Sequence, residues 1–315
     1  MIPVKEKIDC PTYYTLIQNN ILNVLVYFEA FDHPLKLIEI QNNCSEKYAL
    51  DKLNKALDTL LESKVIFEHK GYYSLQSPVT ELVEKRLKSE HIADQYFEKS
   101  DFYIKIIKTM PFVRSVAISG SMSKGVTHSN GDIDYFIITE KNRLWLARTM
   151  LILFKKIFLL NSRKYFCINY FIAIDNMVVP DKNIFTATEI AYLIPVYNAE
   201  LIKSFKESNN WIKAHYPHFN HPIERREHKG TPISKKIMEF LLGGSIGDTL
   251  DKLFMKITIK RWDKKFSNFN REKFELTMRS QRGVSKHHPR DFQNRVLDKI
   301  CKTKSRLYPS ITTKL

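Results

Sequence analysis

The chain has 315 residues, of which 43% are hydrophobic, and it contains few glycines and prolines (9 and 12). A chain of this length and composition can bury two or three cores, which excludes an intrinsically disordered protein. The formal net charge of +16 favours an anionic partner such as a nucleotide or a nucleic acid, although a lysine-rich surface without a ligand would give the same charge.

Charged residues interrupt every apolar stretch of about 20 residues, so the sequence predicts no membrane span. The most apolar candidate, residues 144–160, is interrupted by Arg148, Lys155 and Lys156 and is typical of an amphipathic helix. The first seven residues lack the apolar core of a signal peptide. We therefore expect a cytoplasmic protein whose four scattered cysteines are free thiols: Cys10, Cys44, Cys167 and Cys301.

Residues 13–78 are expected to form the first domain. Apolar residues recur at helical spacing over residues 21–31, a short second helix is expected over 36–41, and a third over 48–63. Residues 65–75 then predict a β-hairpin that turns at Lys70 and Gly71. This order resembles a winged helix-turn-helix domain.

The third predicted helix would enter the major groove if such a domain bound DNA. Its polar face mixes both charges, which is a poor surface for contacting phosphates and bases. DNA binding, protein docking and substrate positioning therefore all remain open. The charged residues of this face are Lys47, Lys52, Lys55, Asp51, Asp58 and Glu62.

Residues 79–215 are expected to form the second domain, which opens with a charged helix over 80–109. An apolar strand over 113–119 follows, then a Gly120-Ser121 turn, and then Asp132-Ile133-Asp134 at the start of a second apolar strand. Residues two apart in a strand face the same way, so Asp132 and Asp134 should project together while Ile133 enters the core. Paired carboxylates suit Mg²⁺ or Mn²⁺, which in turn hold nucleotide phosphates.

The Gly-Ser turn, the gap and the Asp-x-Asp pair resemble the signature of the nucleotidyltransferase superfamily, which includes DNA polymerase beta, poly(A) polymerases and aminoglycoside nucleotidyltransferases. The resemblance covers about residues 113–140. It implies that Gly120 and Ser121 contact the triphosphate and that Asp132 and Asp134 are metal ligands. Lys124, in the following loop, is a candidate to neutralise phosphate charge, with a solvated lysine as the alternative.

Members of this superfamily place a third carboxylate on the next strand, which the β-forming residues 165–173 predict here. The polar residue in the middle of that stretch is Asn169, a candidate for nucleotide binding, which can coordinate through its oxygen but is too weak a base to accept a proton. Asp175, six residues further on and with the same facing parity, is the catalytic candidate. Otherwise another acid takes this role, the acceptor needs no strong base, or the site binds nucleotide without turnover; Asn169 could also be a buried amide bonded to the backbone.

Helices are predicted beyond residue 180, and residues 216–315 are expected to form a helical, basic C-terminal region. Within it, Gly244-Ser245 precedes Asp248 and Asp251, whose spacing of three predicts a helix rather than a second copy of the motif. Residues 281–289 predict a basic loop that contacts phosphate or forms plain surface. Its neighbouring histidines, His287 and His288, do not suit one metal ion.

The predicted fold class is therefore α+β: a winged helix, a central mixed β-sheet of nucleotidyltransferase type flanked by helices, and a helical C-terminal region. The resemblance implies a Mg²⁺-dependent enzyme, with Mn²⁺ as the other candidate cofactor. The enzyme would transfer a nucleoside monophosphate from an NTP to an unidentified hydroxyl acceptor, either a nucleic acid or another anionic molecule. The alternative is a non-catalytic, nucleotide-sensing winged-helix regulator with a degenerate nucleotidyltransferase domain.

Overall fold

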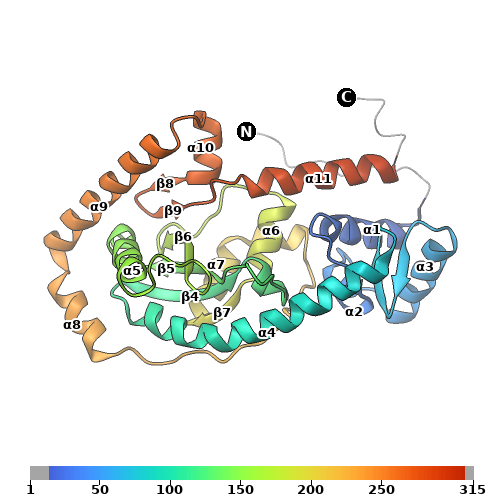
Figure 1. Ribbon diagram of the computed structural model, residues 1–315, viewed down its shortest axis with the longest axis horizontal. Helices are drawn as coiled ribbons and strands as arrows, with labels where there is room; N and C mark the ends of the chain where they lie inside the picture. Colours follow the sequence, from blue (N-terminus) through green and yellow to red (C-terminus); the bar gives the residue numbers. More distant parts are fainter. Residues whose placement is uncertain (1–13, 309–315) are drawn as a thin grey trace. The chain divides into compact units, whose positions relative to one another are not determined.

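A computed structural model describes residues 14–308 (Figure 1). The chain divides into two compact units, which we call the small unit and the sheet unit. Described residues of the small unit are 14–87, 213–220 and 294–308, and those of the sheet unit are 88–212 and 221–293. The expected C-terminal region therefore contributes to both units. Residue 13, Cys10, the first seven residues and the end of the 216–315 region lie outside the described residues.

The small unit consists of helices and a three-stranded antiparallel sheet with strand order β1-β3-β2. Thr15 caps its first helix through a reciprocal pair of hydrogen bonds with Gln18. The three helices and the hairpin expected from the sequence are confirmed, whereas the winged-helix assignment stays a prediction. The elements are α1 (Leu16–Glu29), β1 (Leu35–Lys36), α2 (Leu37–Asn43), α3 (Leu50–Glu62), β2 (Phe67–His69) and β3 (Tyr72–Ser74).

The sheet unit is built on a mixed six-stranded sheet with strand order β7-β4-β5-β6-β9-β8. The central pair, β5 and β6, is parallel, and the other pairs are antiparallel. The mixed α+β class predicted from the sequence is thus confirmed. The strands are β4 (Val113–Ser119), β5 (Asp134–Thr139), β6 (Cys167–Ala173), β7 (Ile194–Tyr197), β8 (Ser280–Gln281) and β9 (Val284–Lys286).

Helices cover both faces of this sheet. On the face that we call the core face, Ile137 and Phe171 pack in one cluster with Trp145 of α5 and Trp262 of α9. On the opposite face, the site face, the ring of Phe205 in α7 lies 4.9 Å from that of Phe136 in β5. The remaining helices of the chain are α4 (Val79–Thr109), η1 (Ser121–Lys124), α5 (Leu144–Phe158), α6 (Ile184–Ala191), α7 (Ala199–Ser208), η2 (Asn210–Ala214), α8 (Ile233–Leu241), α9 (Gly244–Lys265), α10 (Arg271–Met278) and α11 (Phe292–Leu307). The first part of α4, the end of η2 and nearly all of α11 belong to the small unit.

Three strands of the sheet unit were not expected. β7 falls in a region predicted to be helical. The predicted basic loop over 281–289 forms most of the β8–β9 hairpin, and this hairpin joins the sheet through β9, where Lys286 pairs with Tyr170 of β6. These strands have two to four residues, so their partners in the sheet, and not a local apolar alternation, stabilise them.

The second Gly-Ser lies at the start of α9, as expected from the spacing of its acids. There Asp251 accepts a hydrogen bond from the backbone N–H of Leu146, and Asp248 pairs with Arg143. Between residues 14 and 308, the helices lack the combination of length and apolar character that crossing a membrane requires.

Candidate functional site

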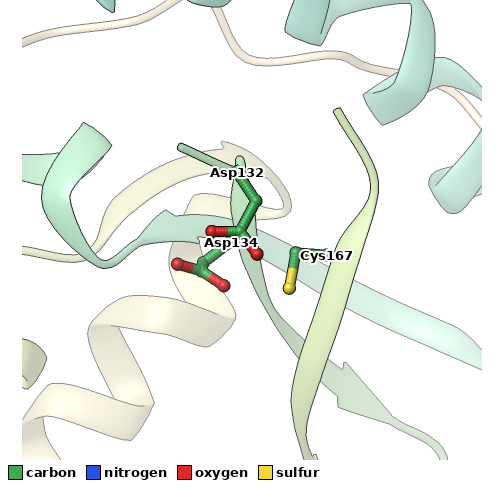
Figure 2. Close-up of side chains that lie close together, drawn as sticks. All are labelled: Asp132, Asp134 and Cys167. Carbon is green, nitrogen blue, oxygen red and sulfur yellow. The ribbon is translucent and has the colours of Figure 1, made fainter. Parts of the chain in front are cut away.

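The two acids of the Asp-x-Asp motif lie side by side where β5 begins. Asp134 is the first residue of β5, Asp132 precedes it by two residues, and Ile133 between them is fully buried. Figure 2 shows both carboxylates next to the thiol of Cys167, at the start of β6. One ligand atom from each of these three residues lies within 4.8 Å of the others. The alternation of a short extended segment is enough to produce this pair.

The Gly120-Ser121 turn lies directly against Asp134. Ser119, the last residue of β4, pairs with Asp134, and Gly120 then turns the chain into η1 with φ of +66°. A Cβ at Gly120 would lie 2.6 Å from Asp134 Oδ2, so only glycine lets the backbone come this close to the carboxylate. The structure therefore brings together the turn and the acid pair that the sequence singled out.

Burial and the neighbouring negative charge of Asp132 raise the pKa of Asp134 to about 7. Two ionised carboxylates in such a place repel each other unless a proton or a cation lies between them. Two carboxylates are the hard oxygen ligands that Mg²⁺ and Mn²⁺ prefer, so the residues present fit the predicted ion.

Cys167 and Asn169 complete the surroundings of the acids. The side-chain amide of Asn169 donates to Cys167 Sγ (2.8 Å) and to Asp134 Oδ1 (3.3 Å). Burial, and then the charge of Asp134, raise the pKa of the Cys167 thiol. A protonated thiol is a poor ligand for a hard cation, so Cys167 would lie beside a Mg²⁺ ion held by the two acids rather than coordinate it. From the sequence, Cys167 was expected only to be a free thiol.

A β-bulge in β6 changes which residues face the site. Asp134 pairs with Cys167 but Phe136 pairs with Tyr170, so the register shifts by one residue between them. Ile168 and Phe171 consequently both pack on the core face, while Asn169 and Tyr170 both line the cavity on the site face.

The structure does not bring Asp175 to the acid pair, which corrects the expected catalytic role. The parity argument assumed an unbroken alternation from Asn169, and the bulge interrupts it. In addition, β5 and β6 are parallel, so Asp134 lies beside the start of β6 while Asp175 follows its far end. There Asp175 Oδ2 lies 3.7 Å from Lys141 Nζ.

Lys124 lies at the turn but is already paired. Its Nζ lies 3.2 Å from the carbonyl oxygen of Gly120 and 2.7 Å from Oε1 of Glu189 in α6. The charge of Glu189 also contributes to raising the pKa of Asp134. Sequence reasoning missed Glu189 because it stands 55 residues after Asp134, on a helix with no local signal of chemistry.

No family model, no curated protein and no solved structure matches this chain. The resemblance to nucleotidyltransferases therefore depends on the motif in residues 113–140 and on the site geometry described above.

Proposed function

We propose that the protein is a Mg²⁺- or Mn²⁺-dependent nucleotidyltransferase that transfers a nucleoside monophosphate from an NTP to a hydroxyl acceptor. One observation carries the proposal: the carboxylates of Asp132 and Asp134 converge beside the backbone of Gly120, in the turn between two neighbouring strands. A carboxylate pair next to a glycine turn offers one place for a cation and another for the phosphates that the cation binds.

Each residue of the site would have a distinct role. Asp132 and Asp134 would hold the divalent cation, which neutralises phosphate charge when bound. The backbone N–H groups of Gly120 and Ser121 would contact the phosphates. Lys124 would exchange its ion pair with Glu189 for a phosphate oxygen, because a bound triphosphate carries more negative charge than one carboxylate.

Transfer requires that the acceptor oxygen attack the α-phosphorus while pyrophosphate leaves and the hydroxyl proton moves to a base. Asn169 cannot accept that proton, and Asp175 lies beyond the far end of β6. Three further carboxylates line the same cavity as Asp134: Asp181, Glu189 and Asp291. Glu189 is the one of these that pairs with Lys124 at the turn, so it replaces Asp175 as the candidate base.

The test is incubation of the purified protein with each NTP and MgCl₂ while pyrophosphate release is followed. Asp134→Asn should abolish release, since it removes a metal ligand without changing the size of the side chain. Asp175→Asn is the matched control and should keep at least half of the wild-type rate. Equal rates in wild type and Asp134→Asn would contradict the proposed site.

A second candidate function, a nucleotide sensor without turnover, is favoured by Asn169. An amide stands where a third carboxylate was expected, and it donates to Asp134 rather than offering a negative charge. Stoichiometric NTP binding that depends on Asp134, together with pyrophosphate release no faster than in buffer, would support the sensor over the enzyme.

A further inference from the structure

A cavity on the site face of the sheet unit adjoins the acid pair. Its volume is about 120 Å³, and its lining includes Gly120, Asp134 and Asn169. The remaining walls are mostly apolar and rich in rings contributed by β5, β6 and the helices beside them: Phe136, Tyr170, Phe185, Phe205 and Phe292. We call it the ring cavity. A ligand in it can reach the carboxylates without leaving the protein.

The sheet register sets how far the rings lie from the acids. Phe136 follows Asp134 by two residues on β5, which places it about 7 Å further along the strand. Tyr170 pairs with Phe136 in the same row, and their rings meet edge to face at 5.4 Å. A flat ring that packs against Phe136 and Tyr170 is therefore about one ring diameter away from the acid pair.

The lysine that lines the ring cavity is paired with an acid of the same lining. Lys286 Nζ lies 3.2 Å from Asp181 Oδ2, and Arg279 donates to the other oxygen of Asp181 at 2.8 Å. The lining also contains the carboxylates of Asp134, Glu189 and Asp291, so a phosphate in the cavity would meet more negative than positive charge, and the apolar walls are better suited to an uncharged group.

His288 gives the ring cavity a neutral polar wall. Burial, and then the charge of Lys286, lower the pKa of His288 to about 4, so the imidazole is uncharged at neutral pH. Its Nε2 is buried and has no hydrogen-bond partner within residues 14–308. Because His288 lines the cavity, a ligand edge with a donor or an acceptor could meet its imidazole there.

We infer that the ring cavity binds a single six-membered heteroaromatic ring of the pyrimidine kind. Apolar cavities of about 150 Å³ hold one benzene ring, so a cavity of about 120 Å³ matches a single ring better than a fused purine. The inference rests on the proposed function and deepens it by naming the substrate class. The ring belongs either to the base of the NTP or to a small acceptor.

The test measures the binding of free nucleosides, which carry no phosphate, in the absence of divalent cations. Calorimetry with the full chain should give dissociation constants at least 10-fold lower for cytidine and uridine than for adenosine and guanosine. Ile190→Phe, which adds a ring to the cavity wall, should weaken cytidine and uridine at least 10-fold. Purine nucleosides that bind as tightly as pyrimidines, or no nucleoside binding at all, would overturn the inference.

A second pair of variants covers the case in which Ile190→Phe does not fold, since Ile190 is only 4% exposed. His288→Gln should weaken cytidine and uridine by at least 5-fold. His287→Gln is the matched control, because the ring of His287 packs on Trp262 at 4.9 Å and does not line the cavity. Equal cytidine affinities in both histidine variants would also count against the inference.

Competition separates the two sources of the ring. If CTP with Mg²⁺ displaces cytidine, the ring is the base of the nucleotide; if the two bind together, the ring belongs to the acceptor. If the protein releases pyrophosphate but Ile190→Phe does not change nucleoside binding, the inference about the ring cavity is wrong and the proposed transferase function stands. If Ile190→Phe abolishes nucleoside binding but no NTP gives pyrophosphate release, the inference about the ring cavity stands and the proposed transferase function is wrong.

Discussion

The carboxylate of Asp134 fills the space that a side chain on Gly120 would need. A Cβ on Gly120 would lie 2.6 Å from Asp134 Oδ2, and the backbone there has φ of +66° and ψ of −149°, a conformation almost confined to glycine. The turn and the acid are thereby held in contact by backbone geometry on one side and by the pairing of Ser119 with Asp134 on the other.

Gly120→Ala should therefore damage both stability and the site. We expect a loss of about 1–3 kcal/mol in the free energy of unfolding and at least a 100-fold loss of pyrophosphate release, because Asp134 must move away. Urea unfolding and the release assay measure the two effects. Gly230→Ala is the control: it has φ of +83° and nothing within 4 Å of its Cβ, so it should lose stability only. Full activity in Gly120→Ala would show that the contact is not needed.

Asp134→Asn should change how stability depends on pH in metal-free buffer. The folded protein keeps a proton on Asp134 up to about pH 7, whereas the unfolded chain releases it near pH 4. The wild-type free energy of unfolding should therefore decrease as pH rises from 4 to 7, and this part of the decrease should vanish in the variant. Melting temperatures at pH 4 and pH 8 test this prediction. Asp134→Asn should melt at a higher temperature than the wild type at pH 8, and this increase should be absent at pH 4. A difference of the same size at both pH values would be inconsistent with a raised pKa.

Mg²⁺ or Mn²⁺ should bind more tightly as pH rises from 6 to 8, because the ion must displace the proton that Asp134 holds in this range. Adding the ion at pH 8 should raise the melting temperature of the wild type, and chelation should reverse the gain. Asp175→Asn should respond as the wild type does, while Asp134→Asn should not respond. Stabilisation of Asp134→Asn by the ion would locate the ion elsewhere.

Glu189→Gln should release Lys124 from its ion pair, whose Nζ–Oε1 distance is 2.7 Å. If Lys124 meets the phosphates, the variant should bind NTP about 3- to 10-fold more tightly at low salt yet turn over more slowly. Lys124→Met should weaken binding by at least 10-fold. Titrations of the two variants with NTP at two salt concentrations measure these affinities. Lys141→Met, which removes the exposed ion pair with Asp175, is the control. Unchanged NTP affinity in Lys124→Met would mean that this lysine only supports α6.

Asp181→Asn should destabilise the protein by about 3 kcal/mol, because it leaves the mostly buried side chains of Arg279 and Lys286 without their counter-charge. Burial acts to raise the pKa of Asp181, but Arg279 and Lys286 together hold it below the usual value. The wild type should lose this contribution only as pH falls below about 4, and the variant should lack that acid-dependent step. Denaturant titrations of the wild type and the variant at pH 3 and pH 7 measure this difference in the free energy of unfolding. If Asp181→Asn lowers the free energy of unfolding at pH 7 by less than about 0.5 kcal/mol, the value expected for the exposed Lys141–Asp175 pair, the prediction is wrong.

The sequence by itself determined the acid pair, because the alternation of three consecutive residues places Asp132 and Asp134 on one face and buries Ile133. It also determined the two strands on either side of the Gly-Ser turn and the main helices before and after them, whose apolar spacing is local. Local pattern was sufficient wherever an element was long enough to show its own periodicity.

Only the tertiary structure decided which other residues join that pair. The bulge in β6 brings both Asn169 and Tyr170 to the site face, and the parallel pairing of β5 and β6 keeps Asp175 away. Glu189 and His288 reach the cavity from α6 and from the residues after β9, elements paired or packed across the sheet rather than along the chain. Strand register and helix packing depend on contacts between distant segments, so no window of the sequence contains them.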